Sequence, residues 1–109
     1  MANPLAAVAA IRKDVNGSTP LWAYANITSQ TTTLLKTGPG VLHSITFNKP
    51  VATGTVKIDD AITDTTPIIG TITVPASPMP VTLIYDVEFR VGLTIVTGTA
   101  DQDITVSFS

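Results

Sequence analysis

Residues 81–95, VTLIYDVEFRVGLTI, are the longest alternating stretch in the chain and decide its fold class. Eight apolar side chains along this stretch share one parity: Val81, Leu83, Tyr85, Val87, Phe89, Val91, Leu93 and Ile95. A period of two is typical of a β-strand with one buried face. Gly92 interrupts the stretch, and a glycine inside a strand usually marks a bulge or a corner between sheets. The stretch therefore predicts two strands, at about 81–89 and 92–97.

Working outward, four further segments show the same period of two. The side chains predicted to face the core are Val41, His43, Ile45 and Phe47 in residues 41–48, Val56 and Ile58 in 54–60, Ile68, Ile72 and Val74 in 68–74, and Ile104, Val106 and Phe108 in 103–109. Residues 27–37 are rich in threonine and have moderate strand character. The turn GTADQ, residues 98–102, is expected to close a hairpin between the last two strands.

Composition and turn residues indicate one all-β domain. Threonine is the commonest residue, followed by valine, isoleucine and alanine, and β-branched residues suit a half-buried sheet. Gly38-Pro39-Gly40 predicts a tight reversal or a sheet-to-sheet corner, for which Gly40 can take a positive φ. We expect a single antiparallel β-sandwich or jelly roll of about seven to eight strands at residues 28–109, preceded by an N-terminal arm at 1–27.

Charged residues are scarce. They make up 13% of the chain, against about 25% in typical soluble domains, and the mean hydropathy is +0.37. Because a soluble monomer normally needs a charged surface without large apolar patches, we expect copies of the chain or a partner to cover part of this surface. The net charge is −2 and the six Lys and Arg residues are scattered, so neither nucleic acid nor a membrane is the expected partner.

The N-terminal arm differs in composition from the rest of the chain. Residues 4–14, PLAAVAAIRKD, fit either a short helix or an extended segment. The charges of this segment follow its apolar part, and Pro4 interrupts that part, so a signal peptide is not expected. We expect the arm to be retained and the protein to be made in the cytoplasm.

Trp22 and Tyr24 are two large aromatic side chains in an irregular part of the arm. Such a segment needs something to hold it, and exposed aromatic surface is costly. We expect both side chains to dock on a neighbouring subunit or a partner, with Leu21 and Ile11 as further interface residues. The alternative is that the two aromatic rings cap the open end of their own sandwich.

His43 is the only histidine, which raises the question of a general base. Its parity places it beside Ile45 on the apolar face, and the sequence around it shows no Ser-His-Asp arrangement. We therefore predict a partly buried structural histidine, no catalytic residue and no enzymatic activity. With no cysteine in the chain, disulfides and cysteine-based metal sites are excluded, and we expect no cofactor.

The aspartates of the turns form two groups, Asp59, Asp60 and Asp64 in one and Asp101 and Asp103 in the other. A calcium site needs clustered oxygen ligands, and neither group matches an EF-hand loop. Turns favour aspartate for local hydrogen bonding. We predict solvated turn carboxylates here rather than a metal site.

Residues 37–60, TGPGVLHSITFNKPVATGTVKIDD, and 87–109, VEFRVGLTIVTGTADQDITVSFS, combine a Gly-Pro-Gly corner, a strand ending in Asp, an F-x-x-G-L-x-I motif and a final ITVSF. Over residues 28–109 this pattern resembles small jelly-roll or β-sandwich virion proteins of tailed bacteriophages, most of all capsid decoration, or cement, proteins. The resemblance implies a homo-oligomer, with a trimer favoured over a dimer. It further implies a place on the capsid exterior of the virion, after synthesis in the host cytoplasm.

The function implied by this resemblance is structural. Such a protein binds the outside of an HK97-type head and stabilises it by bridging major capsid proteins, its expected partner. The alternative is a head- or tail-fibre module that recognises a host surface receptor. A small hydrolase is the third possibility, and it would need a pocket with converging polar groups.

Overall fold

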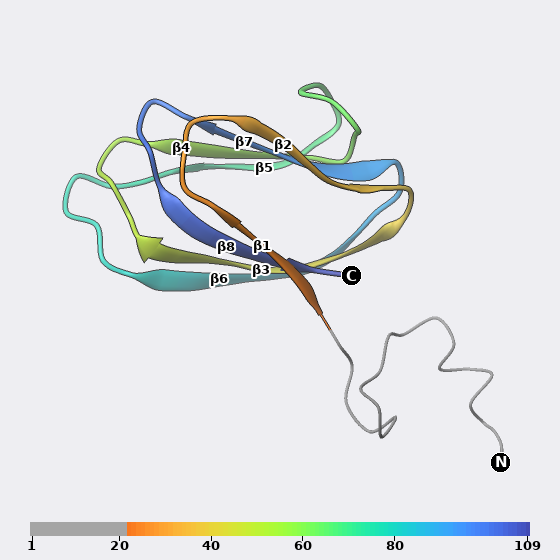
Figure 1. The fold of residues 1–109 in the computed structure, drawn as a ribbon, viewed down its shortest axis with the longest axis horizontal. Helices are drawn as coiled ribbons and strands as arrows, with labels where there is room; N and C mark the ends of the chain where they lie inside the picture. Colours follow the sequence, from red (N-terminus) through yellow and green to blue (C-terminus); the bar gives the residue numbers. More distant parts are fainter. Residues whose placement is uncertain (1–21) are drawn as a thin grey trace, which may run out of the picture.

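The computed structural model describes residues 22–109, which form eight strands in two antiparallel sheets (Figure 1). The strands are β1 (Ala23–Ile27), β2 (Thr32–Thr37), β3 (Gly40–Lys49), β4 (Thr55–Asp59), β5 (Ile68–Thr73), β6 (Val81–Phe89), β7 (Gly92–Gly98) and β8 (Asp103–Phe108). The described part of the chain holds no helix that is long and apolar enough to cross a membrane. The helix or extended segment expected at residues 4–14 lies outside the described residues.

The two halves of the chain pair in reverse order. β1 pairs with β8, β2 with β7, β3 with β6 and β4 with β5, so the chain resembles one long antiparallel ribbon folded over on itself. Two further ladders, β3 with β8 and β4 with β7, join these pairs into the sheets β1-β8-β3-β6 and β2-β7-β4-β5. The structure is a jelly roll, which confirms the all-β sandwich expected from the sequence.

The core lies between the two sheets. Its fully buried apolar side chains come from five strands: Leu42, Ile45 and Phe47 of β3, Val56 and Ile58 of β4, Phe89 of β6, Leu93 and Ile95 of β7, and Ile104 and Val106 of β8. The two strands and the corner predicted for residues 81–95 are confirmed, because β6 and β7 begin at Val81 and Gly92 and belong to different sheets. The predicted alternation holds from Leu83 to Phe89 but was wrong for Val81 and Val91, which are exposed.

A bulge in β3 changes which of its side chains face the core. Leu42 pairs with Phe108 and Ser44 with Ser107, so His43 is an extra residue relative to β8. The extra residue reverses the alternation, and both Leu42 and Ile45 are fully buried. The prediction was therefore right for Ile45 but wrong for His43 and for Val41, whose place in the core is taken by Leu42.

A second bulge, in β5, also changes which side chains face the core. Ile58 pairs with Gly70 and Asp59 with Ile68, which leaves Ile69 as the extra residue. Ile69 packs against the core, whereas the Ile68 side chain is 47% exposed. The prediction that Ile68 faces inward was wrong for this reason, while Val74 is buried as expected.

The first strand lies inside the segment that the sequence assigned to the arm. Ala23 pairs with Phe108 and Ile27 with Ile104, so the sandwich begins at Ala23 and not at residue 28. The inward face of β1 consists of two alanines followed by Ile27. Because alanine contributes little apolar surface, the alternation here is weak in the sequence.

The expected hairpin of the last two strands does not form. β7 and β8 belong to different sheets, so residues 98–102 connect the sheets instead. The buried Gln102 side chain explains the difference: its Oε1 accepts a hydrogen bond from Val51 N at 2.7 Å, and its Nε2 donates to Val51 O at 2.8 Å. This pair of bonds ties the connection to the turn between β3 and β4.

The Gly38-Pro39-Gly40 segment is a corner between the two sheets, which confirms one of the two alternatives predicted for it. The positive φ falls on Gly38, at 93°, and not on Gly40. Gly40 is needed for a different reason, since a Cβ there would overlap the carbonyl oxygen of Ser109 and the ring of Phe89. Pro39 fixes its own φ between the two glycines.

The corner between β6 and β7 is held by Asp60. Its carboxylate accepts backbone hydrogen bonds from Arg90 at 2.9 Å, Val91 at 2.8 Å and Gly92 at 3.4 Å. Burial raises the pKa of Asp60, but these hydrogen bonds together with the nearby Arg90 charge outweigh burial and lower the pKa overall. Gly38 N donates to Val91 O at 2.8 Å, which joins this corner to the one between β2 and β3.

The lowered pKa of Asp60 predicts a pH-dependent contribution to stability. The contribution is present above the unfolded-state pKa of about 4 and is lost as the pH falls through the lower folded-state pKa. We expect Asp60→Asn to lower the free energy of unfolding at pH 7 by about 1–3 kcal/mol. The difference from the unsubstituted protein should shrink at pH 3. Urea unfolding at both pH values measures this, with the exposed Glu88→Gln as the control, and an equal loss at both values would contradict it.

Candidate functional site

The outer face of the β1-β8-β3-β6 sheet carries a group of exposed side chains that we call the outer patch: Trp22, Tyr24, His43, Ile84 and Asp86. One row of paired residues crosses all four strands in the order Tyr24, Ser107, Ser44 and Ile84. Tyr24 is 75% exposed and Ile84 is 60% exposed, and two small serines lie between them. The row is therefore raised at both edges of the sheet and low in its middle.

His43 stacks on Trp22 at one end of the outer patch. The two ring centroids lie 4.5 Å apart with an angle of 7° between the ring planes. His43 Nδ1 also lies 2.5 Å from Asp86 Oδ1. Trp22 thus has one face against an imidazole that is itself held by a carboxylate, and this arrangement fixes the position of the indole.

Irregular backbone geometry positions the side chains of both His43 and Asp86. His43 is the bulged residue of β3, and Asp86 has a φ of 50° where β6 has one residue more than β3. A positive φ is uncommon outside glycine, although aspartate tolerates it better than most residues. Such positions are often found where a side chain must be aimed at a site.

The interface residues predicted from the sequence are only partly described. Trp22 and Tyr24 lie on the outer face of the sheet, and since Tyr24 points into solvent and Trp22 stacks on His43, neither closes an open end of the core. Leu21 and Ile11 lie outside the described residues. The interface prediction stays a prediction, and the outer patch is where its two described residues meet other exposed groups.

The His43 and Asp86 pair contains the same two groups, an imidazole and a carboxylate, that form part of a catalytic triad. Within residues 22–109 no hydroxyl side chain lies within hydrogen-bond distance of the His43 ring. Ser44 is buried and pairs across the sheet with Ser107 rather than approaching the ring. Among the described residues, Asp86 therefore orients the His43 imidazole against the Trp22 indole.

The prediction of solvated turn carboxylates was wrong for two of the five aspartates. Asp59 is fully buried, and its Oδ1 lies 3.5 Å from the Lys57 ammonium, which is also 2.6 Å from Asp64. Asp60 clamps the corner described above. In residues 22–109 no three His, Cys, Asp or Glu side chains converge in a way that could hold a metal ion.

Asp101 and Asp103 also have structural contacts. Asp101 accepts a hydrogen bond from Gln30 N at 3.0 Å. Asp103 accepts from Asn26 at 2.8 Å and from Asn48 at 3.1 Å, which links β1, β8 and β3 on the outer face. The half of the outer face away from Trp22 is therefore occupied by its own hydrogen bonds.

A second feature is an apolar pocket of about 230 Å³ at the edge where β5 and β6 face each other. Its lining consists of Phe47, Pro50, Ile72, Val74, Pro75, Pro78, Met79, Val81 and Leu83. We call it the edge pocket. Every lining side chain is apolar, so the pocket has no polar group with which to orient a small polar substrate.

Sequence reasoning missed two of the five outer-patch residues, Ile84 and Asp86, and the whole edge pocket. The outward positions of Asp86 and Ile84 could have been predicted, because the alternation of residues 81–89 places both on the outward face. The bulge at His43 had a fainter signal, since Leu42 and Ile45 are both apolar but of opposite parity. Pro75, Pro78 and Met79 gave no periodic pattern at all.

Because Trp22 is the only tryptophan, its fluorescence reports directly on the stack with His43. We expect His43→Ala to expose the indole and shift its emission maximum to longer wavelength. Loss of the stack should also lower the free energy of unfolding by about 1 kcal/mol. Asn48→Ala, on the same strand but bonded to Asp103, is the matched control and should leave the emission unchanged. An unchanged spectrum in His43→Ala would show that the stack is absent in solution.

Searches of protein-family models, curated proteins and solved structures found no match to this chain. Arguments about its function therefore depend on the fold, the outer patch and the edge pocket themselves.

Proposed function

We propose that this protein is a structural capsid decoration protein, which binds the outside of a tailed-phage head and stabilises it by bridging major capsid proteins. The observation that carries the proposal is the apolar surface of a small jelly roll with few charges. Ten large hydrophobic side chains are exposed among the described residues: Trp22, Tyr24, Leu34, Val51, Ile62, Ile68, Met79, Val81, Ile84 and Val91. A surface of this kind suits permanent contact with other protein.

The outer patch is the best candidate for the capsid contact. Aromatic side chains are enriched among the residues that dominate protein interfaces, and the patch presents Trp22 and Tyr24 on a rigid sheet. The polar groups beside them are already paired within the protein, as His43 is with Asp86. Docking here would therefore leave few unpaired polar groups.

Weak individual contacts are sufficient for this role. An oligomer that touches several capsid subunits at once gains from effective concentration. A protein that binds only the assembled shell stabilises that shell in proportion to its affinity and concentration. The resemblance of residues 28–109 to decoration proteins supports the same function, with the major capsid protein as partner and a trimer as the favoured oligomer.

One observation favours the alternative, a fibre module that recognises a host surface receptor. Trp22 stacks on His43, which contacts the Asp86 carboxylate, and an indole with hydrogen-bonding groups nearby also suits a sugar ring. The same face of the protein would then contact a host glycan instead of the capsid. The two functions differ in what the protein binds.

Binding to expanded capsids that lack the protein tests the proposal. We expect stoichiometric binding at lattice positions and a raised disruption temperature of the capsid. Ile84→Ser and Tyr24→Ala should each weaken binding about tenfold or more, because each removes apolar contact from the interface. Ile68→Ser, an exposed isoleucine on the other sheet, is the matched control. Binding to host cells but not to capsids would replace the proposal with the receptor function.

A further inference from the structure

The edge pocket needs an apolar occupant. It is open beside Met79, which is 76% exposed, and Val81 at its rim is also exposed. A pocket of about 230 Å³ without polar groups suits one or two aliphatic side chains carried by a protein segment. Exposed apolar surface at the free edge of a sheet is also a hazard, because other chains can pair with it.

The backbone beside the pocket is available for pairing. β6 is the last strand of its sheet and has β3 as its one described neighbour. The first half of β6, from Val81, is regular, while the second half is interrupted at Asp86 by the register shift and its positive φ. Bulges of this kind discourage pairing, so the half of β6 that borders the pocket is the half open to another strand.

The chain itself contains a matching segment. Residues 4–11, PLAAVAAI, are the longest apolar run outside the described residues. In an extended segment, Leu5 and Ile11 lie on the same side. Arg12 and Lys13 follow directly, and the outward side of β6 carries Asp86 and Glu88. A segment running in the same direction as β6 would bring Leu5 and Ile11 to the pocket side and Arg12, which points to the other side, to these carboxylates.

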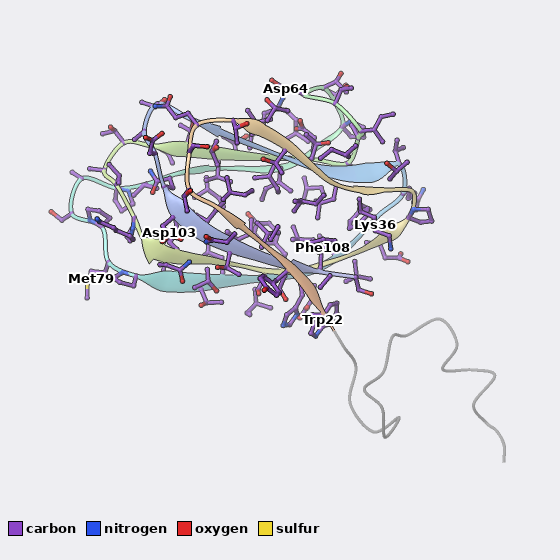
Figure 2. All side chains as sticks on the ribbon, in the orientation of Figure 1. Trp22, Lys36, Asp64, Met79, Asp103 and Phe108 are labelled. Atoms are coloured by element: carbon purple, nitrogen blue, oxygen red, sulfur yellow. The ribbon has the colours of Figure 1, made fainter. Side chains whose placement is uncertain are left out.

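The scarcity of charged residues, 13% of the chain, favours a second copy over the same chain, because copies that cover each other's apolar surface need fewer charges. The described chain begins at Trp22, on β1, and β1 and β6 are the opposite edges of one sheet. Pairing across the four strands aligns Ala23 of β1 with Val87 of β6, and Ile27 of β1 with Val81 of β6. Trp22 and the edge pocket are therefore at opposite edges and opposite ends, roughly 20 Å apart. Figure 2 shows Met79 at the left end of the sandwich and Trp22 below its lower sheet, to the right of the middle.

We propose that residues 4–11 of one copy occupy the edge pocket of a second copy and pair with the first half of its β6. Ten residues separate Ile11 from Trp22, enough to span about 33 Å when extended, so the length of the arm permits the contact within one copy as well as between two, and the experiment below separates these cases. Since the arm leaves one corner and the pocket lies at the opposite corner, the contact is head-to-tail. Such contacts close into rings when the rotation between copies permits. This inference does not depend on capsid binding.

Disulfide trapping tests the proposal, because the chain has no cysteine of its own. The Leu5→Cys and Met79→Cys proteins are mixed, oxidised and separated on a non-reducing gel. We expect a covalent dimer of one Leu5→Cys chain and one Met79→Cys chain as the main product. Leu34→Cys, an equally accessible position on β2, replaces Met79→Cys in the control and should give at most a trace of dimer.

Two results would overturn the proposal. One is the absence of the mixed dimer, and the other is a disulfide that forms only within a single chain carrying both substitutions, which would mean that each copy fills its own pocket. Native mass provides a second measurement: deletion of residues 1–14 and the substitution Met79→Asp should each lower the oligomeric state. Met79 is so exposed that its substitution leaves the core intact, and an unchanged mass in both variants would also reject the proposal.

Discussion

The reverse-order pairing of the two halves of the chain is the constraint on which the rest of the structure depends. Because β1 pairs with β8, β2 with β7 and β3 with β6, six of the seven connections must carry the chain from one sheet to the other. Each crossing removes backbone groups from strand ladders, and those groups need other partners. Asp60, Gln102 and the Gly38-Pro39-Gly40 corner supply them or make room for the crossing.

The bulges connect this architecture to the surface. A regular β3 would have directed His43 into the core, where an imidazole beside Phe47 would need a buried partner. The extra residue turns His43 outward, against Trp22 and Asp86, and it brings Leu42 inward to fill the space. One irregularity thus completes the core and builds the outer patch. The capsid contact that we propose uses the outer patch and the arm exchange uses the edge pocket, with Asp86 and Glu88 between the two surfaces.

The sequence was a good guide to local structure and a poor one to pairing. Alternation at residues 81–95 predicted β6, β7 and the corner at Gly92, because strand periodicity is a property of neighbouring residues. The hairpin expected at residues 98–102 failed because the partner of β7 lies far away in the sequence. The bulges at His43 and Ile69 depend on the register of adjacent strands, which no local pattern contains. In the outer patch, Trp22 and Tyr24 were singled out as large aromatic residues, and Ile84 and Asp86 follow the alternation of β6, but the outward position of His43 depends on the bulge.

The pairing of β1 with β8 also has a consequence for synthesis. Asn26 hydrogen-bonds to Asp103 and to Ile104 O across separations of 77 and 78 residues. The first described strand to leave the ribosome is therefore the one that waits longest for its partner, and the outer face cannot be complete until the last strand has emerged. Folds dominated by such distant contacts form slowly, in milliseconds to seconds. The surface on which Trp22 and Tyr24 sit thus exists only in the finished chain, so an unfinished one has no such surface to offer a partner.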